Sequence, residues 1–167
     1  MANSAIGKYD KASGKKLAAW SGDPKRFAHL NSCAVIDRDL VCANSNYPNV
    51  PMKSWVEVFD PATMTHKRSI DLGELDGSLT WVDRHDGAWW AGLANYDGRG
   101  GAPGRDHRAT KLVKFDDHWK PLQSWTFPDD VLARMAPHSA SGGAFGSDGR
   151  LYVTGHDRPE MYVLAIP

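Results

Sequence analysis

Two histidines are the residues of this sequence whose type and surroundings best suit acid–base chemistry. His138 and His156 carry imidazoles, which titrate near neutral pH and are the commonest general acids and bases in enzymes. His138 is followed directly by Ser139, and His156 by Asp157. We predict that His138 and His156 are the catalytic candidates, with His156 the stronger of the two.

Amide and carboxylate oxygens recur at related places along the chain. Asn46, Asn95 and Asp157 each follow an apolar, strand-like run. Hard cations such as calcium prefer oxygen ligands of this kind. The sequence therefore predicts that Asn46, Asn95 and Asp157 hold calcium or another divalent cation. The residues predicted to bind a small-molecule ligand are Asn31, Asn46, Tyr47, Asn95, Tyr96 and Arg105.

The same residue types have ordinary structural roles, and the sequence leaves both interpretations open. Asn and Asp favour turns because their side chains bond to nearby backbone groups, and histidines are commonly hydrogen-bonded without a catalytic role. The chain has no His-Glu-x-x-His motif and no paired-cysteine spacing, so a zinc site is not predicted. It also lacks the Gly-x-Ser-x-Gly frame of a serine nucleophile.

A glycine-rich insertion at 97–109 carries Arg99, Arg105 and Arg108. It lacks the Gly-Lys-Ser/Thr ending of a phosphate-binding loop, so nucleotide binding is not supported. The insertion could be a lid that brings an arginine such as Arg105 to an anionic substrate, or a mobile surface loop.

The elements that must position these residues belong to a diverged repeat of roughly 50 residues, a period typical of propellers and solenoids. An aromatic–aspartate pair ends an apolar run and begins a polar turn at 9–10, 59–60 and 115–116. Further polar turns separate two strand-like runs at 37–39, 85–87 and 147–149.

The chain is predicted to be all-β, because short β-branched or aromatic runs are bounded by Asp, Gly and Pro. Helix evidence is confined to 128–135. Strands in groups of four without intervening helices indicate β-propeller blades, which are four-stranded antiparallel meanders.

We predict about three blades in a single partial domain, 1–167, that is incomplete or completed by association. Its parts are the outer strands of one blade at 5–22, blades at 29–72 and 76–127, and a partial blade at 138–167. The expected strands are 5–9, 15–20, 31–36, 39–44, 54–59, 66–71, 78–83, 88–94, 110–115, 121–126, 141–146, 150–155 and 160–165.

Strand alternation predicts which loops lie together. In an antiparallel meander, the loop after a blade's second strand emerges on the same side as the connection into the next blade. We call this side the loop face. Propeller ligands bind in such concave places, so the polar residues above are predicted to converge near the propeller axis. The loop-face segments are 29–31, 44–47, 76–78, 95–97, 138–139 and 156–157.

Bulk composition excludes several classes of partner. Lys+Arg and Asp+Glu are both 20 and the net charge is zero, which argues against a nucleic-acid binder or a polybasic membrane protein. No run approaches the roughly 20 apolar residues of a membrane span. The N-terminus has no signal-peptide pattern, but both ends are expected to be truncated, so the sequence assigns no compartment. Expected partners are a small molecule and further blades, from self-association or from a longer chain.

The only two cysteines, Cys33 and Cys42, flank a predicted hairpin. A two-residue turn at 37–38 would place them directly opposite each other and permit a disulfide, whereas a turn one residue later would separate them. Since nothing else in the sequence indicates an oxidising compartment, we expect two buried thiols that act as small apolar side chains.

Four segments resemble uncharacterised bacterial propeller proteins related to the SMP-30/gluconolactonase, NHL-repeat and glutaminyl-cyclase-like families. They are 32–35, 56–63, 77–82 and 148–157. The resemblance implies a six- or seven-bladed propeller but no particular activity. A gluconolactonase-like member would use its cation to polarise a lactone carbonyl. Three function classes follow: a small-ligand-binding propeller, a metal-dependent lactonase- or cyclase-like enzyme, and a non-catalytic scaffold or inactive fragment.

Overall fold

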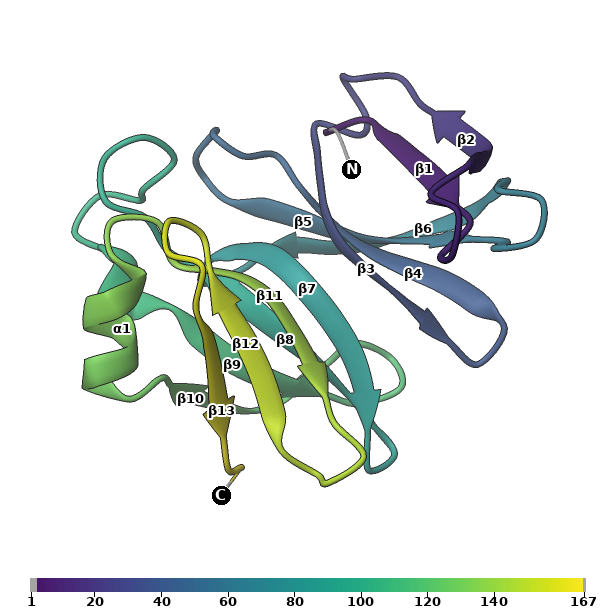
Figure 1. Ribbon diagram of the computed structural model, residues 1–167. Coiled ribbons are helices and arrows are strands. Elements are labelled where there is room, and N and C mark those ends of the chain that lie inside the picture. The colour runs from purple at the N-terminus through teal and green to yellow at the C-terminus, as the bar shows by residue number, and fades with distance from the viewer. Residues whose placement is uncertain (1–2, 167) are drawn as a thin grey trace.

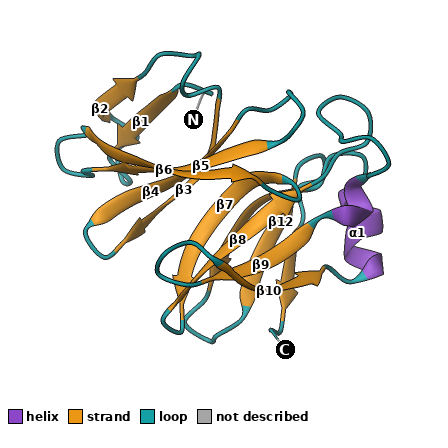
Figure 2. Ribbon diagram, turned by 180° about the vertical axis from the view of Figure 1, so that it is seen from behind, coloured by secondary structure: helices purple, strands orange, loops and turns teal. Residues whose placement is uncertain are grey.

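The computed structural model describes residues 3–166, and these form an all-β fold with one short α-helix (Figures 1 and 2). Helix α1 (Asp129–Met135) and the short 3₁₀ turn His107–Ala109 are the helical elements of the described chain. The strands are β1 (Ala5–Tyr9), β2 (Lys16–Ser21), β3 (His29–Ile36), β4 (Asp39–Ser45), β5 (Lys53–Phe59), β6 (His66–Glu74), β7 (Ser78–His85), β8 (Ala88–Ala94), β9 (Lys111–Phe115), β10 (Pro121–Thr126), β11 (Ala140–Phe145), β12 (Leu151–Gly155) and β13 (Met161–Leu164).

The strands form four antiparallel sheets, and within each sheet every strand pairs with the strands next to it in the sequence. Two sheets have four strands, β3–β6 and β7–β10, and these are flanked by the hairpin β1–β2 and the three-stranded sheet β11–β13. Strand β7 packs against β3 and β4 on one side and against β11 on the other. The fold is therefore a succession of blade-like meanders, as the sequence predicts, and the strand positions differ from the predicted ones by only a few residues.

Burial changes from the inner to the outer strands of a blade. Most residues of β7 and β8 are buried, whereas β10 is exposed along most of its length. Strands covered on both faces need apolar side chains on both faces, so β7 and β8 lack a strict alternation of apolar and polar residues. Trp81, on β7, lies between sheets and is fully buried against the backbones of Gly92 and Gly143.

The core consists mainly of two layers between sheets. The first lies between sheets β3–β6 and β7–β10 and contains Val56, Leu79 and Leu93. The second joins sheet β7–β10 to β11–β13 and includes Leu151. Helix α1 adds its apolar side to this second layer, through Val131, Leu132 and Met135. No helix among residues 3–166 is long and apolar enough to cross a lipid bilayer.

The first strand of each larger sheet carries a β-bulge at the same place. The pairing register shifts between Leu30 and Cys33 in β3, between Leu79 and Trp81 in β7, and between Ala140 and Gly142 in β11. In each case the first strand has one more residue than its partner over that interval. A bulge changes where a side chain points. The three bulges therefore redirect side chains at the equivalent position near the start of β3, β7 and β11.

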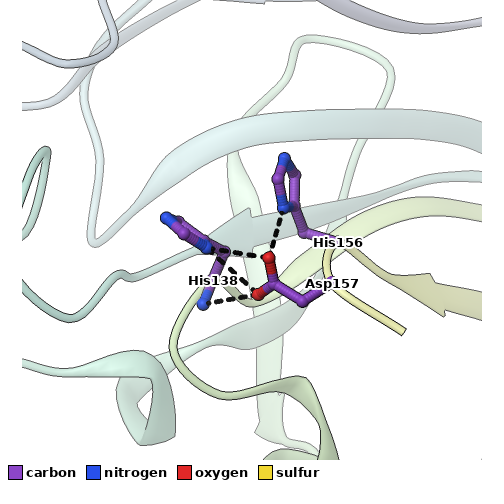
Figure 3. A group of neighbouring side chains, drawn as sticks. All are labelled: His138, His156 and Asp157. Carbon is purple, nitrogen blue, oxygen red and sulfur yellow. Dashed lines mark hydrogen bonds and ion pairs between the residues drawn. The ribbon is translucent and has the colours of Figure 1, made fainter.

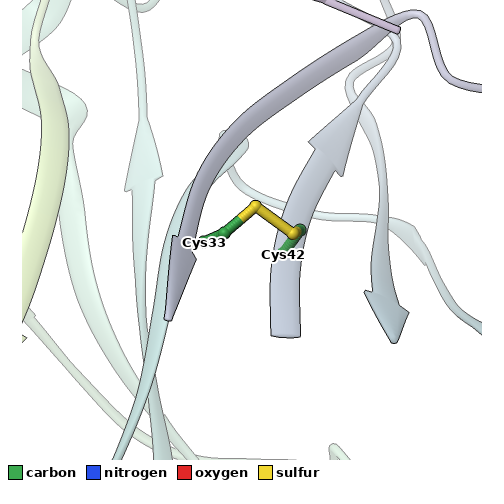
Figure 4. Close-up of a disulfide and its surroundings, with 2 residues drawn as sticks. All are labelled: Cys33 and Cys42. Atoms are coloured by element: carbon green, nitrogen blue, oxygen red, sulfur yellow. A yellow bond between two sulfur atoms is a disulfide. The ribbon is translucent and has the colours of Figure 1, made fainter. Parts of the chain in front are cut away.

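The hairpin β3–β4 corrects the expectation of two free thiols. Cys33 and Cys42 are direct cross-strand partners with Cα atoms 4.0 Å apart, and they form a disulfide (Figure 4). Ile36 pairs with Asp39, so the turn is the two-residue turn at 37–38, and Asp37 has a φ of 55°, as tight hairpins require. The hairpin register brings the two side chains together, and this local geometry outweighs the lack of other signs of oxidation in the sequence.

Candidate functional site

A pocket of about 320 Å³ opens on the loop face, where the first strands of three sheets meet. Its lining combines residues from the starts of β3, β7 and β11 with residues from the loops that follow β4, β8 and β12. The lining residues are Asn3, His29, Leu30, Asn31, Tyr47, Thr80, Tyr96, His138, Ser139, Ala140, Ser141 and His156.

The three bulges supply a matched set of polar side chains to this pocket. Asn31, Thr80 and Ser141 each follow the last regularly paired residue before the bulge, and all three line the pocket. Asn31 was predicted from the sequence as a ligand-binding residue, whereas Thr80 and Ser141 were not. The available signal was their equivalent position in the repeat, two residues after His29, Ser78 and Ser139 respectively. That signal is weak in a single sequence, because the three side chains differ in type.

His138, His156 and Asp157 form a compact cluster at one side of the pocket (Figure 3). His138 Nδ1 lies 3.0 Å from Asp157 Oδ2, and His156 Nδ1 lies 2.9 Å from Asp157 Oδ1. The backbone N–H of His138 also donates to Asp157 Oδ2, at 3.3 Å. The segment before β11 and the turn after β12 are thus joined by one carboxylate.

The protonation of this cluster follows from its hydrogen bonds. The bonds from His156 and His138 hold the pKa of Asp157 below its usual value, so the carboxylate is ionised at neutral pH and can only accept hydrogen bonds. Each neutral imidazole must then carry its proton on Nδ1 and present a lone pair on Nε2. Across the pocket, burial lowers the pKa of His29, with a smaller electrostatic contribution from His156 in the same direction.

Two tyrosines form a further part of the pocket wall. The rings of Tyr47 and Tyr96 pack edge to face with centroids 5.0 Å apart, and Tyr47 also contacts His29. Burial raises the pKa of the Tyr96 hydroxyl to about 12. The insertion 97–109 packs against Tyr47. The backbone of Gly100 lies so close to this ring that a Cβ on Gly100 would be 2.3 Å from it. A glycine at this position therefore lets the insertion lie against the pocket wall.

Ser139 contributes a polar group that has no internal partner. It is 1% exposed and lines the pocket, and its Oγ makes no hydrogen bond to any described residue. Buried hydroxyls are normally hydrogen-bonded, because leaving one unpaired costs about 1–3 kcal/mol. Ser139 Oγ is therefore a buried hydroxyl of the pocket wall whose hydrogen-bonding capacity no described residue uses.

Asn46, Asn95 and Arg105 do not line this pocket. The Asn46 amide donates to Pro51 O and accepts from Lys53 N–H, both at 2.9 Å, and so closes its own loop. Asn95 is fully buried, and its amide donates to two backbone carbonyls, those of 76 and 109. Arg105 is held 3.0 Å from Asp76 and lines a separate hollow. The two amides thus have the turn-stabilising role that the sequence left open, while Asp157 lies between histidines.

A second buried polar cluster, centred on Glu57, was not predicted. Glu57 is 1% exposed and accepts hydrogen bonds from Asn44 at 3.0 Å and from Ser69 at 2.5 Å. His66 Nε2 lies 2.8 Å from the same carboxylate, and its ring packs among Trp20, Phe27 and Phe59. Each interaction joins neighbouring strands or their flanking turns, which indicates a structural role.

Comparisons with known proteins add little to this description. No protein-family model matches this chain, and no curated protein matches it in sequence. Among solved structures, the one described as the structure of the Dos1 propeller is similar, with a TM-score of 0.45 and 10% sequence identity. The match covers 95% of this chain, which spans only 39% of that structure's length. The assignment of a propeller-like fold rests on the strand order and the packing of the sheets described above.

Proposed function

We propose that this domain binds a small, neutral, hydroxylated molecule, such as a monosaccharide or a sugar lactone, in the loop-face pocket. The polar groups that line the pocket are hydroxyls, amides and imidazoles, and none of its lining residues among 3–166 is Lys, Arg, Asp or Glu. Such a lining offers donors and acceptors to hydroxyl groups without demanding a charge on the ligand. The rings of Tyr47 and Tyr96 add apolar surface to the wall.

The repeated bulge is the observation that carries this proposal. Three sheets each place one uncharged polar side chain, Asn31, Thr80 or Ser141, in the same pocket. Ser139 adds a buried hydroxyl without a partner. The volume of about 320 Å³ lies at the lower end of the range of about 300–1,000 Å³ for small-molecule sites, which suits a ligand the size of one sugar ring.

Hydrolysis of a lactone is a second candidate function, favoured by the contact between His156 and Asp157. A carboxylate that orients an imidazole through Nδ1 leaves Nε2 able to take a proton from water. His156 Nδ1 is 2.9 Å from Asp157, and His156 lines the pocket. We expect any glucono-δ-lactone hydrolysis above the spontaneous rate to fall at least about tenfold in His156→Ala.

Saturation-transfer NMR with glucose, galactose and glucono-δ-lactone tests the binding proposal. We expect at least one of these compounds to bind, and Ser141→Ala to weaken its binding by about fivefold to tenfold, the effect of losing one hydrogen bond. Ser147→Ala is the matched control, because Ser147 is exposed in a turn and does not line the pocket. Binding that is unchanged in Ser141→Ala, or no binding by any of the three compounds, would leave a scaffold role as the better account.

A further inference from the structure

We propose that His138, His156 and Asp157 bind a divalent transition-metal ion, of which zinc is the representative. The inference rests on the proposed function, because the ion would lie in the wall of the same pocket. It shares Asp157 with the calcium site expected from the sequence, but differs from that site in its other ligands and in its metal.

The three side chains already surround one point. Each offers one ligand atom, and these atoms all lie within 4.8 Å of one another. The two Nδ1 atoms are 2.9 and 3.0 Å from the nearest oxygens of Asp157. Around a tetrahedral zinc ion with bonds of about 2.0–2.2 Å, ligand atoms are about 3.3–3.5 Å apart. The carboxylate must retreat from each imidazole by a few tenths of an ångström to admit an ion. The two imidazole ligand atoms, which lie within 4.8 Å of each other, must come to about 3.5 Å or less.

The donor set selects the kind of metal. Two imidazole nitrogens and one carboxylate oxygen are the ligands of zinc sites that keep a fourth position open for water or substrate. Nitrogen donors of this kind suit zinc, nickel and copper, whereas calcium and magnesium prefer oxygen alone. On binding, each neutral imidazole moves its proton from Nδ1 to Nε2, and the ion takes the place of the two Nδ1–H donors at Asp157.

Hydrogen bonds among the three ligands bring them together before any ion binds, and His156 and Asp157 remain exposed to solvent. His156 and Asp157 are adjacent in the turn after β12. His138 lies 19 residues earlier, but its backbone N–H bonds to Asp157 and its ring centroid is 4.8 Å from that of His156. A ligand set that is assembled in advance loses less conformational entropy on binding.

The unpartnered Ser139 Oγ is an independent feature of this part of the pocket, because no described residue satisfies this buried hydroxyl. Ser139 follows His138 directly and is 1% exposed. Its hydroxyl could accept a hydrogen bond from a metal-bound water or contact the pocket's ligand.

A second cluster, formed by Asp97, Asp106 and His107, has comparable spacing but different chemistry. Asp106 is paired with the guanidinium of Arg108, which already supplies a positive charge there. Asp97 accepts both the backbone N–H and the ring nitrogen of His107. We expect no ion at this second cluster, which serves as an internal control.

The test is titration of the full chain, freed of metal by a chelator, with zinc chloride in a calorimeter. Both cysteines are held in the disulfide, so reductant must be left out to keep thiolates from competing. We expect one ion per chain, and binding at least about tenfold weaker in His138→Ala, His156→Ala and Asp157→Asn. His118→Ala and His107→Ala should bind zinc like the original chain; His118 is exposed in a turn. Calcium chloride in excess should not compete.

Cobalt(II) gives a second readout if a variant folds poorly. A tetrahedral site predicts visible ligand-field absorption from the original chain and from His118→Ala, and its loss in His156→Gln. Zinc binding that persists unchanged in both His138→Ala and His156→Ala would overturn the site, as would the absence of binding at about millimolar zinc. If zinc fails while a sugar or lactone binds, the metal site is wrong and the proposed function stands. If zinc binds at these residues but no hydroxylated compound does, with or without zinc, the metal site stands and the proposed function is wrong.

Discussion

The indole ring of Trp81 lies directly against the backbone of Gly143, so that strands β7 and β11 of different sheets meet at a position with no room for a side chain. A Cβ on Gly143 would lie 2.4 Å from Trp81 Cε2, and Trp81 is fully buried. Nearby, the backbone N–H of Phe145 donates to Asp83 at 2.7 Å, and the rings of His85 and Phe145 stack. The contact between these two sheets is therefore close along much of β11.

Gly143→Ala should destabilise the fold. The added methyl group must displace the Trp81 ring or the backbone, and overpacking of this kind costs about 1–3 kcal/mol. Chemical denaturation followed by tryptophan fluorescence measures the change. Gly155→Ala is the matched control, because its Cβ would meet Met135 at an ordinary distance of 3.5 Å. Equal stability of the two variants would show that β7 and β11 are not packed as closely as described.

Reduction of the disulfide should lower the stability of the chain. Cys33 and Cys42 are separated by nine positions, and closing a loop of that size restricts the unfolded chain by about 2–3 kcal/mol. Urea unfolding with and without reductant measures this difference. The Cys33→Ala/Cys42→Ala double variant should be insensitive to reductant. A wild-type midpoint that does not move on complete reduction would contradict the prediction.

Glu57→Gln should destabilise the sheet β3–β6 by about 1–3 kcal/mol. The carboxylate accepts from Asn44 and Ser69 and contacts His66, all in a buried setting, and an amide would place two donors where acceptors are needed. Thermal and urea unfolding measure the loss. Glu74→Gln is the control, because Glu74 is exposed and its nearest cation, Lys53, is 3.9 Å away. A Glu57→Gln variant no less stable than Glu74→Gln would mean that the cluster contributes little.

Asp157 should make stability depend on pH in the acid range. Hydrogen bonds from His156 and His138 lower its pKa in the folded chain, so the folded state favours the carboxylate more than the unfolded chain does, where Asp titrates at about 3.9. The stabilising contribution is therefore present above about pH 4 and is lost as pH falls through the lowered folded value. Urea unfolding between pH 2.5 and 7 should show the original chain more stable than Asp157→Asn near neutrality. The difference in stability between the two proteins should shrink in acid. A stability difference that grows as pH falls would contradict a lowered pKa of Asp157 in the folded chain.

The sequence by itself determined the strands and the short helix, and it limited the β3–β4 hairpin to two registers, between which the structure decides. These features depend on neighbours along the chain: apolar and β-branched runs extend, aspartate and glycine turn, and a two-residue turn at 37–38 places Cys33 opposite Cys42. The alternation of antiparallel strands also indicated the loop face, on which a pocket lies.

Only the tertiary structure decided which side chains reach that pocket and which form hydrogen bonds elsewhere. Three bulges bring Thr80 and Ser141 into the pocket beside Asn31, while Asn46 closes its own loop. Asp157 meets His138 across 19 positions, and Glu57 becomes buried among groups from neighbouring strands. Each of these outcomes depends on pairing register and on contacts between segments distant in the sequence. Local residue preferences are the same whether an amide faces a pocket or its own turn, so such preferences cannot distinguish the two.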